Sequence, residues 1–257
     1  MILSTKVLLE QKDGVIYVTL NRPEAYNSLD VPMLEELLGK LQEASKMEEK
    51  ILVLKGSGKG FSAGGDIKSM LASFDTPFES IMKIIGGVVS ALYEMPKLTI
   101  SAIHGAAAGL GLSIALACDY VVADSSSKVA MNFIGIGLVP DGAGHFFLQK
   151  RLGDVRAKEV IWEGKTLSAN EGLKYGLVDV VADNLEEAIA NKVSEWKQKP
   201  VLAMIATKAI YVQQSLPSLH KTLEIEMKYQ GEMRATRDHK EGVTAFIEKR
   251  LPNYIGK

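Results

Sequence analysis

Leu98–Cys118 (LTISAIHGAAAGLGLSIALAC) is a run of twenty-one residues with no Asp, Glu, Lys or Arg. Length alone would allow this run to span a membrane. However, it divides into a β-branched half, LTISAI, and a helix-like half, LSIALA, around a turn rich in glycine. It also contains Ser101, His104 and Ser113. A buried strand, a loop and a helix explain this pattern better than a membrane span does.

The same order of strand, loop and helix is predicted upstream. Val15–Leu20 (VIYVTL) alternates with period two and ends before Pro23. Asp30 precedes a helical pattern that extends to about Lys46. The other expected elements are a strand at 51–54, a helix from about 65–66, a helix at 77–94 and short strands at 119–123 and 129–133. Alternating strands and helices predict an α/β core with mostly parallel strands.

The last third of the chain is expected to be helical. Helices are predicted at 142–151, 154–163 and 168–175, and three more follow Leu185, separated by Pro200 and Pro217. Ser168 and Glu171 have the spacing of a capping box. These helices are too few to enclose a core of their own. We therefore expect them to pack on the first part of the chain or on a neighbouring subunit.

The composition excludes several classes of protein. The chain has 257 residues, 47% of them hydrophobic, a formal net charge of −1 and no block of five or six like charges, so nothing in it suggests a protein that binds nucleic acid or a membrane surface. The single cysteine, Cys118, cannot form an intramolecular disulfide, and Lys6 and Glu10 interrupt the apolar run that a secretory peptide needs. We expect a cytoplasmic protein. The four histidines lack metal-ligand spacing, so no metal site is predicted.

Two glycine-rich turns stand between a predicted strand and a predicted helix, at 61–66 (FSAGGD) and 105–111 (GAAAGLG). Small side chains let a ligand approach the backbone, and free N–H groups at a helix start attract negative charge. Two such turns that converge would form an oxyanion hole. Tight packing of strand on helix explains the glycines equally well, so both interpretations stay open at this point.

Nucleotide-binding motifs fit this region poorly. A phosphate-binding P-loop needs Ser or Thr after Gly58-Lys59, where Gly60 stands. Gly58, Gly60 and Ala63 match the dinucleotide pattern G-x-G-x-x-A, but residues 61–66 continue as a loop where that motif requires a helix. An NAD-binding dehydrogenase is therefore a weak alternative.

Five blocks of sequence together resemble the crotonase superfamily, the enoyl-CoA hydratase/isomerase family. They are 21–29 (NRPEAYNSL), 61–67 (FSAGGDI), 104–119 (HGAAAGLGLSIALACD), 136–144 (IGLVPDGAG) and 245–250 (AFIEKR). The resemblance implies a spiral of ββα repeats, with residues 1–195 as the core and 196–257 as a C-terminal helical trimerisation region. It also implies homotrimers or dimers of trimers that act on acyl-CoA thioesters, with coenzyme A as part of the substrate and no prosthetic group.

The resemblance also assigns site residues. It places the two oxyanion-hole N–H groups on Gly65 and Leu110. The positions that resemble those holding or closing over coenzyme A are Ala25, Ala63, Asp66, Ile67, Phe246 and Lys249. Each reaction of such a family passes through a thioester enolate, which two fixed N–H groups stabilise. For Lys249, a solvated surface lysine is the alternative.

Two positions depart from the pattern of the hydratases. The resemblance aligns Ser113 and Phe133 with the two glutamates that hold and activate water in those enzymes. Neither side chain can act as a carboxylate base, and Phe133 would make that corner of the site dry. A hydration mechanism with two glutamates is therefore not expected.

Asp141, in VPDGAG, is the carboxylate that remains well placed. In several branches of the superfamily an aspartate at the matching position moves the proton, and burial beside Phe133 and Val139 would raise the pKa of this carboxyl. The alternative is that Asp141 only caps a helix beginning at Gly142. We expect a double-bond isomerase that uses Asp141 as acid and base. A hydratase with other water-activating groups and a weakly catalytic CoA-ester binding protein are the alternatives.

Other candidates are less specific. His104 is expected to brace the turn that follows it, whereas the role of His145 stays open. The apolar helix at 77–94, together with Met70 and Leu71, could line an acyl pocket or simply pack in the core.

Overall fold

The central element of the fold is a six-stranded sheet with the order β1-β2-β3-β4-β6-β9. The computed structural model describes residues 5–67 and 77–257. The strands are β1 (Val7–Lys12), β2 (Val15–Leu20), β3 (Ile51–Gly56), β4 (Leu98–Ile103), β6 (Tyr120–Asp124) and β9 (Val180–Ala182). Within this sheet β1 pairs antiparallel with β2, and the other neighbouring strands pair parallel. The expected α/β core with mostly parallel strands is confirmed.

A second sheet, with three strands, includes part of the glycine-rich turn at 105–111. It has the order β5-β7-β8, formed by β5 (Ala106–Ala108), β7 (Lys128–Ala130) and β8 (Thr166–Ser168). β5 lies within the glycine-rich turn that the sequence predicted as a loop. Its backbone pairs with β7 and so fixes the position of that turn.

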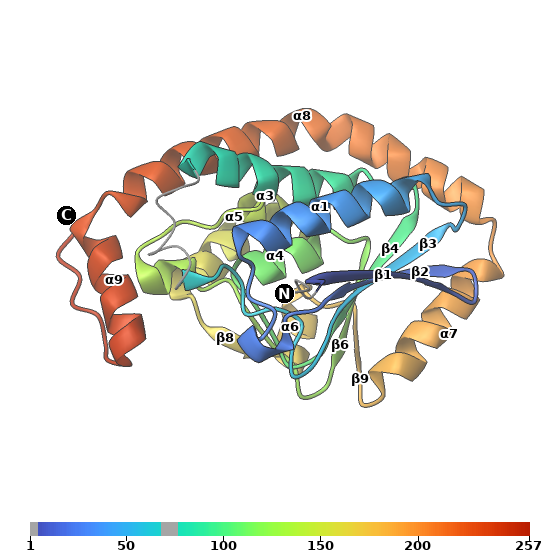
Figure 1. The fold of residues 1–257 in the computed structure, drawn as a ribbon, viewed down its shortest axis with the longest axis horizontal. Helices are drawn as coiled ribbons and strands as arrows, with labels where there is room; N and C mark the ends of the chain where they lie inside the picture. Colours follow the sequence, from blue (N-terminus) through green and yellow to red (C-terminus); the bar gives the residue numbers. More distant parts are fainter. Residues whose placement is uncertain (1–4, 68–76) are drawn as a thin grey trace.

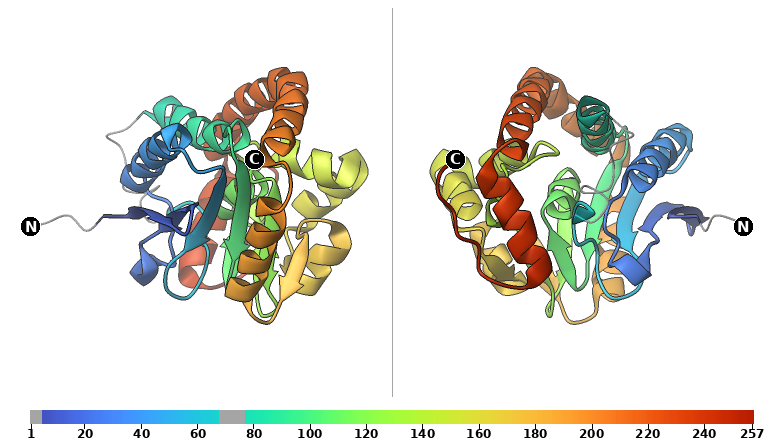
Figure 2. Two further views of the ribbon diagram at one scale, coloured as in Figure 1. Left: turned by 90° about the vertical axis from the view of Figure 1, so that its right-hand side faces the viewer. Right: turned by 60° about the vertical axis from the view of Figure 1, so that its left-hand side comes forward.

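Helices cover both faces of the main sheet (Figures 1 and 2). The α-helices are α1 (Val31–Lys46), α3 (Phe78–Tyr93), α4 (Leu110–Leu116), α5 (Gly144–Glu163), α6 (Ala169–Tyr175), α7 (Leu185–Lys197), α8 (Val201–Arg234) and α9 (Arg237–Glu248). Short 3-10 helices, η1 (Pro23–Ala25) and η2 (Phe133–Ile136), interrupt the loops. In Figure 1, α9 lies at the opposite end of the molecule from α7.

Strand β3 separates two hydrophobic cores, because its alternating side chains point to opposite faces. Leu52 and Leu54 belong to the larger cluster with α1, α3 and α4. Ile51 and Val53 belong to the smaller cluster with α7. Burial on both faces explains why the ILVL run is continuously apolar.

Several predicted helix ends are confirmed. The Asp30 carboxylate accepts a hydrogen bond from the N–H of Met33 at 2.9 Å and caps α1. Ser168 and Glu171 form the predicted capping box of α6, and Gly176 ends that helix in the left-handed conformation. These short-range signals depend only on neighbouring residues.

The helices expected at 142–151 and 154–163 are confirmed as two helical segments of α5, the first beginning at Gly144, with non-helical dihedral angles at Gly153 between them. Two other predictions were wrong. The strand expected at 129–133 ends at Ala130, and Phe133 begins η2 instead. Pro217 lies inside α8 rather than between two helices. Proline costs a helix interior about 3 kcal/mol, but Leu216 and Leu219, on either side, pack on the main core and hold the helix together.

Two further expectations concern the ends of elements. A helix was expected to start near 65–66, and the residues that would form most of it, 68–76, lie outside the described part of the chain. The expected boundary between residues 195 and 196 falls within the last turn of α7. Over residues 5–67 and 77–257, no helix is both long and apolar enough to cross a membrane.

Candidate active site

The two glycine-rich turns lie side by side. Ser62 and Ala107 form a parallel β-bridge. The N–H of Ser62 donates to the carbonyl of Ala106 at 2.9 Å, and the N–H of Ala108 donates to the carbonyl of Ser62 at 3.0 Å. Backbone hydrogen bonds on both sides therefore hold the turns in register. Their convergence, left open by the sequence, is a feature of the structure.

Gly64 makes this close approach possible. Its φ is +90°, and a Cβ at this position would lie 2.6 Å from the carbonyl oxygen of Ala108. Real Cβ atoms do not come so close to backbone, so a larger residue would push the turns apart. The glycine is thus needed for the distance between the turns as well as for its dihedral angle.

The backbone hydrogen bonds between the segments of Leu29 and Gly65 do not use the N–H of Gly65. Leu29 donates to the carbonyl of Gly64 at 2.8 Å, and Asp66 donates to the carbonyl of Leu29 at 3.1 Å. This pattern uses the carbonyl of Gly64 as an acceptor and the N–H of Asp66 as a donor, but not the N–H of Gly65. The N–H of Gly65 donates no hydrogen bond to any other residue in the described ranges.

The N–H of Leu110 is the first of α4. Gly109 precedes the helix without a side-chain cap, and its own N–H donates to the carbonyl of Ala130 at 2.8 Å. The first N–H groups of an α-helix have no partner within the helix. The N–H groups of Leu110 and Gly65 are therefore both available for an oxygen atom of a ligand.

One cavity of about 330 Å³ contains both of these positions. Its wall is formed by Ala63, Gly64, Gly65, Ile67, Gly109, Leu110, Asn132, Phe133, Gly135, Ile136, Leu138, Asp141, Gly164 and Phe246. Of the candidate residues, the structure thus brings together Gly65, Leu110, Asp141, Ala63, Ile67 and Phe246. Ala25, Asp66 and Lys249 are not on this wall.

Asp141 is the titratable side chain on the described wall of the cavity. Its Oδ1 atom is buried and has no hydrogen-bond partner among residues 5–67 and 77–257. Burial and the negative charge of Glu226 raise the pKa of Asp141 to about 8, and the charge of Arg234 opposes the shift. The expected rise in pKa is confirmed, and the sequence did not reveal the contribution of Glu226.

The carboxylate of Asp141 does not cap a helix. Helix α5 begins at Gly144, not at Gly142, and its N-cap residue Ala143 provides no side-chain cap. Instead, Glu226 of α8 accepts hydrogen bonds from the N–H of Ala143 at 2.7 Å and from the N–H of His145 at 3.1 Å. The capping interpretation of Asp141 was therefore wrong, because a residue distant in sequence performs that role.

Ser113 and Phe133 stand at the two positions where the resemblance would place water-activating glutamates. The Ser113 hydroxyl is fully buried and donates to the backbone carbonyl of Asp141 at 2.9 Å. Phe133 lines the cavity with 8% of its surface exposed. Neither residue supplies a carboxylate to this wall.

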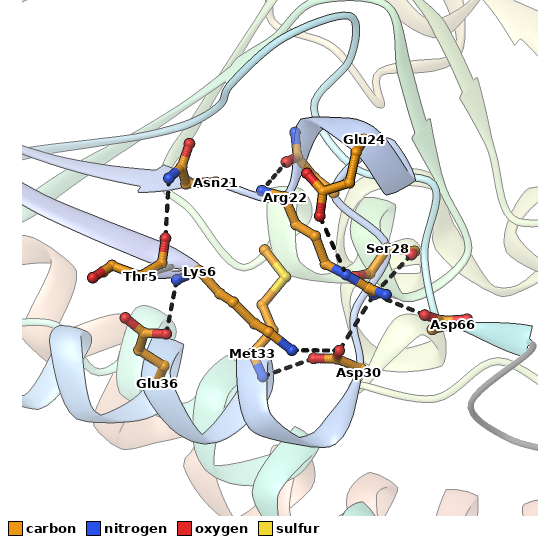
Figure 3. A network of polar contacts seen from close by, with 11 residues as sticks. Thr5, Lys6, Asn21, Arg22, Glu24, Ser28, Asp30, Met33, Glu36 and Asp66 are labelled. Atoms are coloured by element: carbon orange, nitrogen blue, oxygen red, sulfur yellow. Dashed lines mark hydrogen bonds and ion pairs between the residues drawn. The ribbon is translucent and has the colours of Figure 1, made fainter. Parts of the chain in front are cut away.

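Charged side chains fasten the segment that carries Ala25 to the segment that carries Asp66 (Figure 3). The Arg22 guanidinium lies 2.7 Å from Asp66 Oδ2 and 3.4 Å from Asp30 Oδ2. Lys6 pairs with the same Asp30 oxygen at 2.6 Å. These pairs hold the loop that ends in Gly65-Asp66 against the start of α1.

Of the two residues expected to close over coenzyme A, Phe246 lies in α9 and Lys249 directly follows that helix. Phe246 is 59% exposed and contributes to the cavity wall. Lys249 is the exposed C-cap residue of α9 and does not reach that wall. The apolar helix predicted at 77–94 corresponds to α3, whose buried side chains pack in the main core. Met70 and Leu71 lie outside the described residues.

The two histidines have different environments. His104 Nε2 lies 3.0 Å from the carbonyl oxygen of Gly58, which agrees with the expected bracing of the turn. His145 Nδ1 lies 2.8 Å from Glu226 Oε1. His145 thus faces the buried carboxylate of α8 and is absent from the wall of the cavity.

Sequence reasoning missed three polar residues on α8. Glu226, Gln230 and Arg234 occur at intervals of four, a spacing that places them on one helix face. This spacing was a signal in the sequence. Nothing local, however, indicated that this face would lie against Asp141.

Comparison with known proteins gives a consistent result. Residues 10–257 match the family described as enoyl-CoA hydratase/isomerase. Over 243 residues the chain is 48% identical to Bacillus subtilis YhaR, which is named for the same family, covering 94% of this chain and 95% of that one. A Streptococcus mutans trans-2-decenoyl-[acyl-carrier-protein] isomerase is 32% identical, covering 98% of both chains.

The fold comparison agrees. The crystal structure of an enoyl-CoA hydratase from Mycobacterium avium subsp. paratuberculosis superposes with a TM-score of 0.88 at 32% identity. The match covers 97% of this chain and 98% of that one. The expected ββα spiral with its C-terminal helical region is thus confirmed.

Proposed function

Because the chain belongs to the enoyl-CoA hydratase/isomerase family, we propose that it shifts a double bond within an enoyl-CoA thioester. The N–H groups of Gly65 and Leu110 hold the thioester oxygen, and Asp141 carries the proton. The observation that supports this most is that both turns and Asp141 share one cavity.

The proposed reaction starts from a 3-enoyl-CoA. The Asp141 carboxylate removes a proton from Cα, and the electron pair moves into the carbonyl to give a dienolate. The two N–H groups stabilise the negative oxygen. Asp141 then returns the proton to Cγ, which leaves the double bond between Cα and Cβ. No water or redox partner is consumed.

The protonation behaviour of Asp141 suits this cycle. A pKa of about 8 leaves both the acid and the base populated near neutral pH. General acid–base catalysis is most effective when the pKa of the group lies near the working pH. An ordinary carboxyl, almost fully ionised at neutral pH, would be a poorer acid for the second step.

The side chains of Phe133, on the cavity wall, and of the buried Ser113 support isomerisation over hydration. Phe133 and Ser113 occupy the positions at which the resemblance would require water-activating glutamates. Relatives of both kinds are similar to the chain, including a short-chain-enoyl-CoA hydratase of Clostridium acetobutylicum at 33% identity. The preference for isomerisation therefore depends on the site residues rather than on these names.

We propose that the CoA part of the substrate lies over the loops around Ala25, Ala63, Asp66 and Ile67, with Phe246 and Lys249 closing over it. Coenzyme A enters as part of the substrate, and no prosthetic group is needed. We also propose a homotrimer or a dimer of trimers. Large apolar side chains exposed on α8 and α9 support assembly: Ile210, Tyr211, Ile225, Tyr229, Phe246 and Ile247.

The test is an assay of the purified protein with 3-enoyl-CoA and 2-enoyl-CoA. Asp141→Asn should slow isomerisation by about 10²- to 10⁴-fold, the usual contribution of a general base. Asp183→Asn, an exposed aspartate, is the matched control. Efficient hydration of 2-enoyl-CoA, or CoA binding without any turnover, would contradict the proposal.

A further inference from the structure

Helix α8 presents a row of polar side chains to Asp141. Glu226 and Gln230 are almost completely buried, with 2% and 1% of their surfaces exposed. Arg234 follows one turn later and acts on Asp141 through its charge. Burying polar side chains is costly unless each has a partner. The partners of Gln230 are therefore informative.

The hydrogen bonds of Gln230 fix the orientation of its amide. Its Nε2 atom lies 2.5 Å from the backbone carbonyl oxygen of Val139. A carbonyl oxygen can only accept, so the atom facing it must be the NH₂ group rather than the amide oxygen. The same nitrogen lies 3.4 Å from Asp141 Oδ2. One N–H thus serves Val139, and the other is directed to Asp141.

This arrangement makes the two carboxyl oxygens of Asp141 unequal. Oδ2 faces an N–H donor, so a proton on Oδ2 would point at another proton. Oδ1 is buried without a partner in the described part of the chain. The neutral carboxylic acid is therefore favoured with its proton on Oδ1.

We propose that Gln230 is a positioning residue: its N–H faces Oδ2 of Asp141 and so directs the transferred proton to Oδ1. This inference depends on the proposed function, since it names the oxygen that exchanges the proton. Gln230 itself touches neither the substrate nor the reacting carbons.

Other charged groups near Asp141 affect how strongly it holds the proton. Glu226 disfavours the carboxylate and Arg234 favours it. His145, from α5, contacts Glu226 and acts through it. These charges act on the carboxyl as a whole, whereas the Gln230 contact distinguishes one oxygen from the other.

The first test is Gln230→Met, which keeps the length of the side chain and removes both N–H donors. We expect kcat to fall about tenfold with little change in KM, which corresponds to one charge-assisted hydrogen bond. The pKa of Asp141 should rise, because the carboxylate loses its donor. Gln213→Met, an exposed position on the same helix, is the matched control and should leave both quantities unchanged.

A second variant reverses the polarity at nearly constant shape. Gln230→Glu presents an acceptor to Oδ2 and should draw the Asp141 proton to that oxygen. Isomerisation should then fall at least as far as in Gln230→Met. Wild-type kcat and wild-type pH dependence in both variants would overturn the proposal.

A measurement on the free enzyme separates this proposal from the proposed function. The ¹³C resonance of the Asp141 carboxyl, identified by its loss in Asp141→Asn, reports its titration without substrate. If wild-type enzyme has no isomerase activity but the Asp141 titration shifts in Gln230→Met, the proposed function is contradicted and the contact between Gln230 and Asp141 is supported. An unchanged titration in an active Gln230→Met enzyme would contradict the role of Gln230 alone.

Discussion

The Oε2 atom of Glu226 lies 2.7 Å from the backbone nitrogen of Ala143, two residues after Asp141. Glu226 is 2% exposed and also accepts from the backbone and the ring of His145. The same carboxylate therefore caps α5 and places a negative charge near Asp141. It links the stability of the turn to the chemistry of the site.

Glu226→Gln separates these effects. Loss of the charge removes one of the causes that raise the pKa of Asp141, so the apparent pKa in the pH–rate profile should fall below about 8. Loss of an acceptor for Ala143 should lower the free energy of unfolding by about 1–3 kcal/mol. Glu224→Gln, exposed on the same helix, should change neither. An unchanged profile would show that the charge of Glu226 does not reach Asp141.

The raised pKa of Asp141 predicts how the stability of the fold depends on pH. Between about pH 4 and pH 8 the folded chain holds a proton on Asp141 that the unfolded chain has released. Its contribution to the free energy of unfolding therefore falls as the pH rises through this window, by an amount on the order of a few kcal/mol. The free energy of unfolding of Asp141→Asn minus that of wild type should therefore be larger at pH 8 than at pH 5. Urea denaturation of both proteins at the two pH values measures the difference, and parallel curves would contradict it.

Gly64→Ala tests the spacing of the two turns. The new Cβ would meet the carbonyl of Ala108 at 2.6 Å at a φ of +90°, so the substitution should separate the turns. We expect activity to fall at least tenfold and the free energy of unfolding to fall by about 1–3 kcal/mol. Gly39→Ala, in α1 with no atom within 4 Å of the added Cβ, should instead stabilise the protein slightly. Wild-type activity in Gly64→Ala would show that the spacing of the turns is unimportant.

Arg22→Ala tests the attachment of the first turn. Removal of the guanidinium breaks the contacts with Asp66 at 2.7 Å and Asp30 at 3.4 Å, next to the N–H of Gly65. We expect kcat/KM to fall about tenfold as this N–H loses its fixed position. Arg22→Lys should restore part of the loss, and the exposed Arg156→Ala should have no effect. If Arg22→Ala has the same kcat/KM as Arg22→Lys and Arg156→Ala, Arg22 does not position the N–H of Gly65.

Local sequence signals predicted much of the fold. β2 and β4 begin and end where their β-branched runs do, at Val15–Leu20 and Leu98–Ile103. The Asp30 cap and the Ser168 capping box could also be predicted from the sequence, because each involves residues only three apart. Pro217 was misread because helix propensity is local, whereas the packing that carries α8 through it is not.

The site was only partly predictable. The sequence indicated two glycine turns and a carboxylate near Phe133, which the structure places around one cavity. It could not indicate Glu226 or Gln230, which lie 85 and 89 residues after Asp141 and reach it only through the packing of α8. Their spacing of four showed a polar helix face but not its partner.

Hydrogen exchange at the α-carbon of a saturated acyl-CoA in D₂O isolates enolate formation, because such a thioester can form an enolate but can be neither hydrated nor isomerised. With wild-type enzyme we expect NMR to detect deuterium entering Cα, and Asp141→Asn should slow this exchange about 10²- to 10⁴-fold. Equal exchange rates in wild type and Asp141→Asn, or no exchange by an enzyme that hydrates 2-enoyl-CoA, would contradict the proposed function.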